Sequence, residues 1–221
     1  MEYSEWEPVY LEIVKDLGLE INEDENSVRA MKALTLNSDL VMDDVLIDLI
    51  GRNVTVFGDA GSLEDDIGKT EPCGTLISAG SATERVLEAG IVPHMVVTDL
   101  DGNVDSQIEA SGSGAVTLVL AHGDNYDAVA RYVREFRGPL ILTTQSRPFG
   151  TVMNYGGFTD GDRSVCTARH FGAKRILLEG FDFKNPRLKP RDDPERSMKK
   201  LEWARRIIYE MNLPDVDIVR P

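Results

Sequence analysis

The sequence has few residues suited to redox or structural metal chemistry, since only 2 of its 221 residues are cysteines. Cys73 and Cys166 lie far apart and form neither a zinc-binding nor a redox spacing. This spacing predicts two reduced thiols, as in a cytoplasmic protein. Long hydrophobic runs are also missing. No apolar stretch approaches the roughly 18 residues of a transmembrane helix, and the acidic first residues lack a signal-peptide core.

Basic side chains are scarce as well, with 24 Lys and Arg against 38 Asp and Glu and a formal net charge of −14. This balance argues against binding to nucleic acid or to an anionic membrane, because both need a basic surface. The basic residues are unevenly distributed, since 14 of them lie in residues 163–221. A solvated terminal helix would explain this asymmetry, and so would an anionic ligand bound by the C-terminal part.

The first fifty residues have the apolar spacing of helices. Trp6, Tyr10 and Ile13 recur on one helical face, as do Val28 and Met31 on a second. A third helix is expected to begin at one of the capping residues 37–39. We therefore expect a helical N-terminal segment over residues 1–51.

From residue 53 onward, short apolar runs alternate with amphipathic stretches of helical spacing. The six runs are residues 54–57, 75–78, 95–98, 116–120, 140–143 and 176–178. Apolar strands separated by helices predict an α/β fold, with a mostly parallel sheet of about six strands and helices on both faces. This domain is expected over residues 52–221, and its last helix is basic.

Glycine and carboxylate residues follow each predicted strand, at the sheet edge where such folds bind ligands. Asp99 and Asp101 follow the third strand one residue apart, so on an extended backbone both side chains share a face. Two carboxylates in one site repel each other, and a divalent cation usually compensates. Mg²⁺ fits because it prefers oxygen ligands and takes substrate phosphates. An Asp-Gly turn before a helix cap would give the same residues without a metal.

Further carboxylates follow at the same edge. Asp124, after the fourth strand, is predicted to be a third metal ligand, although a plain helix N-cap would also explain it. Asp160 and Asp162 begin a helix, where the dipole favours carboxylates whatever the function. One of them is expected to complete the metal site or to accept a proton, and the sequence leaves the choice between them open.

Small residues at strand ends can bring backbone N–H groups close to phosphates. Those after the first two strands are Gly58, Gly61, Ser62, Gly80 and Ser81. Ser81 with Glu84 is also an ordinary capping box. The pair Gly156 and Gly157 allows a ligand to approach the main chain. No arrangement of Ser, His, Asp or Cys suits covalent acyl catalysis.

Three motifs carry a family resemblance: Val-Thr-Asp-Leu-Asp-Gly at 97–102, Ala-His-Gly-Asp-Asn at 121–125 and Gly-Gly-Phe-Thr-Asp-Gly-Asp-Arg at 156–163. In this order they resemble the archaeal 6-hydroxymethyl-7,8-dihydropterin pyrophosphokinases, which are similar in fold to thiamin pyrophosphokinase. The resemblance implies Mg²⁺-dependent transfer of diphosphate from ATP to the hydroxymethyl group of a reduced pterin, with release of AMP. The product would enter folate or tetrahydromethanopterin biosynthesis.

The resemblance also implies roles for individual residues. Asp99, Asp101, Asp124 and Asp160 would hold Mg²⁺, and Asp101, Asp124 and Asp162 would act in catalysis. The residues expected to bind ATP or the pterin are Gly58, Gly61, Ser62, Gly80, Ser81, Asn125, Thr144, Gln145, Gly157, Thr159, Arg163, Lys199 and Lys200. The stretch 184–194 is expected to act as a lid, and the fold analogy favours a homodimer.

Other functions remain open on the sequence. Asp99-Leu100-Asp101 would also suit a nucleotide-sugar glycosyltransferase, which would release a nucleoside diphosphate instead of AMP. A haloacid-dehalogenase phosphatase also has Asp-x-Asp-Gly after a strand, but there the motif usually starts the domain, and here two strand units precede it. A non-catalytic nucleotide-binding module would bind its ligand and form no product.

Overall fold

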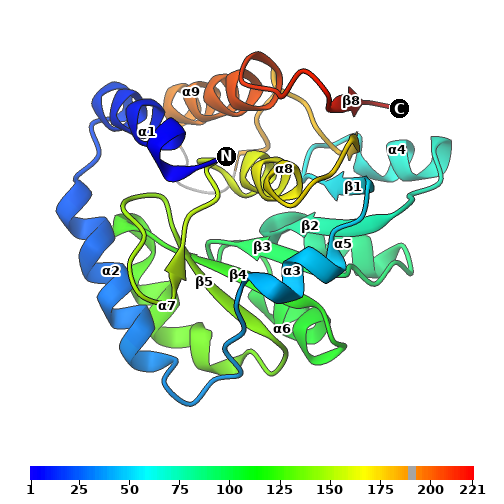
Figure 1. Cartoon of the computed structure of the whole chain (residues 1–221). Helices are drawn as coiled ribbons and strands as arrows, with labels where there is room; N and C mark the ends of the chain where they lie inside the picture. The colour runs from blue at the N-terminus through cyan, green and yellow to red at the C-terminus, as the bar shows by residue number, and fades with distance from the viewer. Residues whose placement is uncertain (189–192) are drawn as a thin grey trace.

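The computed structural model describes residues 1–188 and 193–221, so the middle of the expected lid, residues 189–192, lies outside the described part. The described chain forms one parallel sheet of eight strands in the order β6-β5-β4-β3-β2-β1-β7-β8 (Figure 1). Their bounds are β1 (Asn53–Phe57), β2 (Thr75–Ala79), β3 (Met95–Thr98), β4 (Val116–Ala121), β5 (Leu140–Thr144), β6 (Val152–Met153), β7 (Arg175–Glu179) and β8 (Asp217–Val219).

The predicted α/β class is confirmed, and the predicted number of strands was too low. The two additional strands, β6 and β8, lie at opposite edges of the sheet and contain only two and three residues. Runs this short have no recognisable hydrophobic pattern, because a period of two needs at least four residues to show. They become strands only by pairing with β5 and β7.

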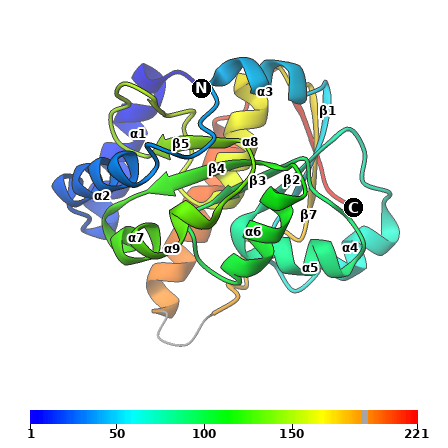
Figure 2. The same cartoon turned by 90° about the horizontal axis from the view of Figure 1, so that it is seen from below.

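Helices cover both faces of the sheet. Their bounds are α1 (Tyr3–Leu17), α2 (Ile21–Leu34), α3 (Asp43–Leu49), α4 (Leu63–Lys69), α5 (Thr83–Glu88), α6 (Val104–Gly112), α7 (Tyr126–Tyr132), α8 (Asp160–His170) and α9 (Pro194–Arg205). One face packs against α3 and α8 through a core that includes Leu46, Val56, Val97 and Val165. The other face carries α2, α7, α6, α5 and α4, which follow one another across the sheet in Figure 2.

The start of the third helix differs from the prediction, because α3 begins at Asp43 and not at residues 37–39. Residues 39–41 instead run beside the start of β5. The Leu140 amide donates to the Asp39 carbonyl at 2.8 Å, and the Val41 amide donates to the Leu140 carbonyl at 3.0 Å. Pairing with the sheet therefore replaces the local capping that the side chains favoured.

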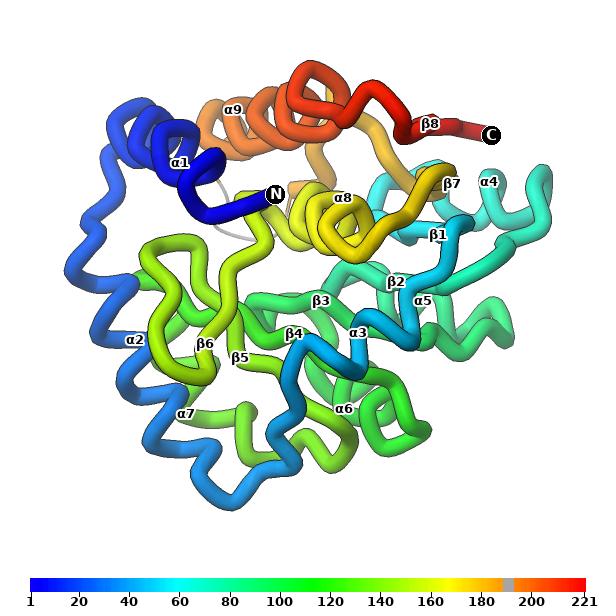
Figure 3. The backbone as a smooth tube through the Cα atoms, viewed as in Figure 1, coloured from blue at the N-terminus to red at the C-terminus, as the bar shows by residue number. Residues whose placement is uncertain are grey.

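The first and last helices of the chain form an outer layer over α8. Trp6, Tyr10 and Ile13 of α1 share a buried cluster with Cys166 of α8 and Trp203 of α9. Figure 3 shows α1 beside α9, although they lie at opposite ends of the sequence. Cys73 is exposed, and both it and buried Cys166 are free thiols. Within the described residues, no helix combines the length and the apolar composition needed to cross a membrane.

Candidate active site

A cavity of about 440 Å³ lies at the carboxyl edge of the sheet, where the strand ends predicted a ligand crevice. Residues that follow β1, β2, β3, β4, β5 and β7 form its floor. Its other walls come from α9, from the beginning of α8 and from residues around the α1–α2 turn. Both ends of the chain thus contribute to one site.

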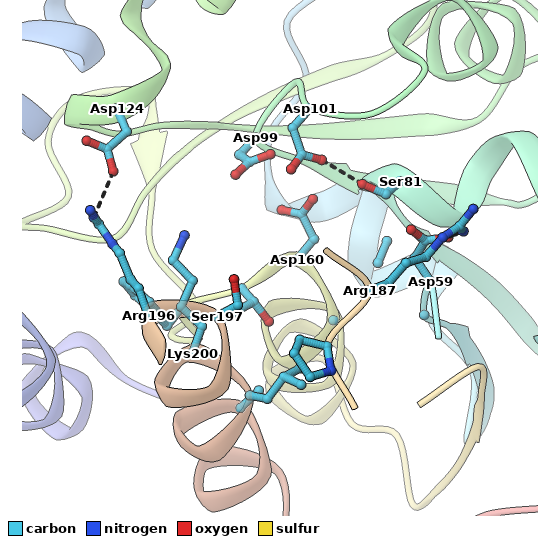
Figure 4. Close-up of a pocket in the computed structure, with 18 of the residues that line it drawn as sticks. Asp59, Ser81, Asp99, Asp101, Asp124, Asp160, Arg187, Arg196, Ser197 and Lys200 are labelled. Atoms are coloured by element: carbon cyan, nitrogen blue, oxygen red, sulfur yellow. Dashed lines mark hydrogen bonds and ion pairs between the residues drawn. The ribbon is translucent and has the colours of Figure 1, made fainter. Parts of the chain in front are cut away.

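Three carboxylates converge in the middle of this cavity (Figure 4). Asp99, Asp101 and Asp160 each place an oxygen within 4.8 Å of the other two. The first two follow β3, and Asp160 is the first residue of α8, which crosses over β1, β2 and β3 on its way from β6 to β7. The fold therefore brings the two predicted acidic motifs together.

The carboxylates of Asp99 and Asp101 are oriented by a left-handed turn and not by an extended strand. Leu100, which separates them, has a φ of 67° while its side chain stays buried. The Leu100 amide donates to Thr98 Oγ1 at 2.8 Å, which holds the turn. Such a conformation is costly for a leucine and is typical of functional sites held by the surrounding fold.

The charge on Asp160 is poorly compensated by the described residues. Its Oδ1 atom is buried and has no hydrogen-bond partner among them. Burial raises the pKa of the Asp160 carboxyl well above its ordinary value, and the nearby charges of Asp99 and Asp101 raise it further. Gly80 makes room for this carboxylate, because a Cβ atom there would lie 2.8 Å from Asp160 Oδ2.

The loop after β4 touches the acidic cluster through His122. The backbone amide of Asp124 donates to His122 Nδ1 at 3.2 Å, so in the neutral ring the proton is on Nε2. That Nε2 atom lies 3.4 Å from Asp99 Oδ2. Asn125 fixes the same loop, since its Nδ2 atom donates to the carbonyls of Asp99 and Leu120 at 2.8 and 2.7 Å.

Basic side chains flank the acidic cluster on two sides in Figure 4. On one side, Arg196 and Lys200 extend from α9, and Arg196 Nη2 lies 3.1 Å from Asp124 Oδ2. On the other side, Arg187 Nη1 lies 2.5 Å from Asp59 Oδ1. The arrangement places cationic side chains on both sides of the acidic cluster.

The structure brings many of the predicted residues to the cavity. Those in its lining are Gly58, Ser81, Asp99, Asp101, Asp124, Gln145, Thr159, Asp160 and Lys200. Asp124 lies in the wall but pairs with Arg196 and is not part of the cluster of Asp99, Asp101 and Asp160. Its assignment as a metal ligand stays a prediction.

Other predicted residues lie outside the lining, and most have a structural partner. Asp162 is fully buried and caps α8, since its carboxylate accepts hydrogen bonds from the amides of Phe158 and Thr159 and from Thr159 Oγ1. Thr144 Oγ1 lies 3.0 Å from Ser146 Oγ. The remaining predicted residues outside the lining are Gly61, Ser62, Gly80, Asn125, Gly157, Arg163 and Lys199.

Arg163 and Lys199, both predicted to bind ATP or the pterin, have other charged neighbours in the structure. Arg163 is buried within α8, where burial lowers its pKa and the charges of Asp162 and Asp160 partly offset that effect. Lys199 Nζ lies 3.4 Å from Asp16 Oδ1 of α1, on the outer layer. Neither residue lines the cavity, and their role in binding ATP or the pterin stays a prediction.

Residues of the α1–α2 turn and of α2 contribute to the cavity, which was not predicted from the sequence. Glu20, Glu23 and Asp24 line the cavity, and the Asp24 side chain is buried. A signal was present, because Asp24 stands four residues before Val28 and seven before Met31, on the same helical face. A carboxylate on an apolar helical face indicates a buried polar partner.

One buried carboxyl next to the cavity makes folding sensitive to pH. Glu179 ends β7, is fully buried, and neither of its side-chain oxygens has a hydrogen-bond partner in the described chain. Burial, together with the charge of Asp66, raises its pKa from 4.5 to about 7. The folded protein thus keeps a proton that the unfolded chain loses above pH 4.5, and stability falls as the pH rises from there through about 7.

Glu179→Gln is therefore expected to remove about 2 kcal/mol of the stability loss between pH 5.5 and pH 8. Urea unfolding of both proteins at these two pH values measures the effect. Asp65→Asn is the control, since Asp65 is an exposed carboxylate beside Asp66, and it should leave the pH dependence unchanged. An identical pH dependence in Glu179→Gln and the unmodified chain would contradict this account.

A parallel α/β sheet with an acidic cluster at its carboxyl edge, flanked by arginine and lysine, is typical of proteins that bind phosphorylated ligands. Within that class, the sequence matches one particular family. Residues 30–187 match the model of the family described as 6-hydroxymethylpterin diphosphokinase MptE-like, and the chain belongs to this family. The resemblance drawn from the three motifs is thereby confirmed.

Named relatives match the chain along nearly its whole length. A protein of Pyrococcus furiosus is 41% identical over 94% of this chain and 93% of its own length. Proteins of Methanothermobacter thermautotrophicus and Methanocaldococcus jannaschii are 40% and 32% identical, over 94% of this chain and 94% and 95% of their own lengths. All three are named 6-hydroxymethyl-7,8-dihydropterin pyrophosphokinase.

Proposed function

We propose that this chain transfers the β,γ-diphosphate of ATP to the hydroxymethyl group of 6-hydroxymethyl-7,8-dihydropterin and releases AMP. The observation that carries the proposal is the convergence of Asp99, Asp101 and Asp160 between cationic side chains, in a chain whose relatives carry the name of this activity. The product would enter the biosynthesis of folate or of tetrahydromethanopterin.

The acidic cluster suits Mg²⁺ by its chemistry. Carboxylate oxygens are the ligands this cation prefers, and three of them from two elements lie within 4.8 Å of one another. The buried Asp160 Oδ1 atom has no hydrogen-bond partner among the described residues, so it is available to a cation. Asp99, Asp101 and Asp160 would hold Mg²⁺, which when bound supplies positive charge to neutralise the phosphates.

The residues of the chain position the two substrates. In the transfer, the hydroxymethyl oxygen bonds to the β-phosphorus and loses its proton to water. The bond from that phosphorus to the bridging oxygen breaks, and AMP leaves with that oxygen. Such a reaction depends on alignment and on charge neutralisation rather than on covalent catalysis. Arg187, Arg196 and Lys200 line the cavity, and we propose that they align the triphosphate. His122 Nε2–H faces Asp99 and orients the carboxylate.

The direct test is incubation with ATP, Mg²⁺ and 6-hydroxymethyl-7,8-dihydropterin, followed by separation of the nucleotides and pterins. We expect AMP and the pterin diphosphate in equal amounts, and neither without a divalent cation. Formation of ADP, or nucleotide binding without a pterin product, would overturn the proposal. The first result would indicate another transfer reaction, and the second a binding module.

Lys200 provides a test of triphosphate binding. Lys200→Met is expected to raise the KM for ATP about tenfold and to change kcat less, because a phosphate contact is lost in the ground state as well as in the transition state. The matched control is Lys199→Met, since Lys199 pairs with Asp16 outside the cavity. Equal KM values for ATP in the two variants would contradict the role of Lys200.

A further inference from the structure

The buried carboxylate of Asp24 joins four distant parts of the chain. It stands on α2 and is only 4% exposed. It accepts hydrogen bonds from Tyr10 Oη of α1 at 2.5 Å, from the Gly123 amide after β4 at 2.7 Å and from Gln145 Nε2 after β5 at 2.8 Å. Asp24, Gly123 and Gln145 all line the cavity.

These contacts fix which atom of Gln145 a ligand can use. A carboxylate only accepts hydrogen bonds, so the amide nitrogen of Gln145 must face Asp24. The amide oxygen is then the only acceptor that the Gln145 side chain can offer to a ligand. The main chain of the same residue is also held, because Trp6 Nε1 donates to the Gln145 carbonyl at 2.8 Å. Both contacts come from the N-terminal helices.

Tyr10 keeps the arrangement in one protonation state. Burial and the hydrogen bond to Asp24 raise the pKa of the Tyr10 hydroxyl above its ordinary value. The hydroxyl therefore stays protonated and donates to Asp24. With three donors on one carboxylate, reversal of the Gln145 amide would place two acceptors against each other.

We propose that Asp24 is a positioning residue that sets the hydrogen-bonding sense of the site. It holds the Gln145 amide oxygen toward the cavity, where that oxygen accepts a hydrogen bond from an N–H group of the bound heterocycle. The identity of the heterocycle rests on the proposed function. Both the adenine of ATP and the aminopyrimidine ring of the pterin present such N–H groups, and the binding of each is measured separately.

Asp24→Asn tests this idea with almost no change in shape. The new amide keeps its oxygen on the Gly123 amide, which is a fixed donor. Its nitrogen then faces Gln145, whose amide must turn its oxygen toward position 24 and its nitrogen toward the cavity. The Gln145 amide nitrogen and the N–H group of the heterocycle are then two donors that face each other. We therefore expect the affinity for one heterocycle to fall about tenfold. The KM of that substrate should rise with a smaller change in kcat.

Exchanging the two side-chain types should restore binding. In the double variant Asp24→Asn with Gln145→Glu, the carboxylate moves from position 24 to position 145 and the net charge stays the same. One of its oxygens accepts from the amide at position 24, and the other again offers an acceptor to the cavity. Restored affinity would separate the effect from a general loss of structure, which a second substitution would not repair.

The experiment is calorimetric titration of each folded protein with ATP and, separately, with 6-hydroxymethyl-7,8-dihydropterin. Glu25→Gln is the control on the same helix, because Glu25 is exposed and pairs with Arg29 at 3.3 Å, and it should bind both like the unmodified chain. Gln145→Met removes the acceptor without touching Asp24, and it decides the question if Asp24→Asn does not fold. It should lose affinity for the same heterocycle.

Two results would overturn the inference. One is unchanged affinity for both compounds in Asp24→Asn, or in Gln145→Met if the first variant is unfolded. The other is a loss of affinity that the exchanged pair does not restore. Failure of the proposed function has a different readout, because the unmodified chain would then form no pterin diphosphate. Titration with ATP would still test the role of Asp24 in that case.

Discussion

Asp160→Asn is expected to lower the rate of AMP formation by about three orders of magnitude while making the protein more resistant to heat without Mg²⁺. The loss follows because one of three converging carboxylates no longer carries charge. The gain in stability has the same origin. The Asp160 carboxylate is shielded from water and repelled by Asp99 and Asp101, so a neutral amide of the same shape relieves the folded state.

Thermal unfolding with and without Mg²⁺, together with turnover, measures both effects. We expect Mg²⁺ to raise the midpoint of the unmodified chain and to leave that of Asp160→Asn nearly unchanged, since bound ligand stabilises only the state that binds it. Asp105→Asn is the control, because Asp105 is an exposed carboxylate at the start of α6. A fully active Asp160→Asn variant would show that the acidic cluster is not the reaction centre.

Gly157→Ala is expected to destabilise the protein by about 4 kcal/mol or more and to abolish turnover with it. Gly157 has a φ of 89°, which an alanine tolerates poorly. A Cβ atom there would also lie 2.4 Å from Arg163 Cα and 2.7 Å from the Arg163 amide nitrogen. Because these are backbone atoms, the first turn of α8 would have to move, and Asp160 would move with it.

Denaturant unfolding of Gly157→Ala against Gly112→Ala separates this packing effect from a general intolerance of alanine. Gly112 lies in α6, and a Cβ atom there would meet nothing within 4 Å. Its substitution should be neutral or slightly stabilising. If Gly157→Ala folded with unchanged stability, the close approach to Arg163 would not be a constraint on this glycine.

The paired glycines Gly156 and Gly157 show how much of the site could be predicted from the sequence. They were interpreted as room for a ligand, and the structure shows that Gly157 makes room for the backbone of α8, while its role in ligand binding stays a prediction. The need for glycine at this position was predicted correctly. The segment that approaches it, the backbone at Arg163, could not be identified from the sequence. The partner of a glycine depends on which helix crosses over it, and this is decided by packing over the whole domain.

The sequence contains a signal that indicates which of Asp160 and Asp162 faces the cavity. Thr159 with an acidic residue three positions later has the pattern of a capping box, and Asp162 forms such a cap in the structure. Asp160 is then the carboxylate left for the cavity. By contrast, the network of Asp24 depends on residues 10, 123 and 145, whose proximity only the folded chain creates.

Because the turn between α1 and α2 and the helix α9 both line one cavity, the site is completed late in synthesis. Gly18 and Asp24 line this cavity together with Ala204, so nearly the whole chain must leave the ribosome before the cavity exists. Substrate binding therefore reports on completed chains only. A fragment released early would carry Asp99 and Asp101 at the end of β3 but would have neither Asp160 nor the cations of α9.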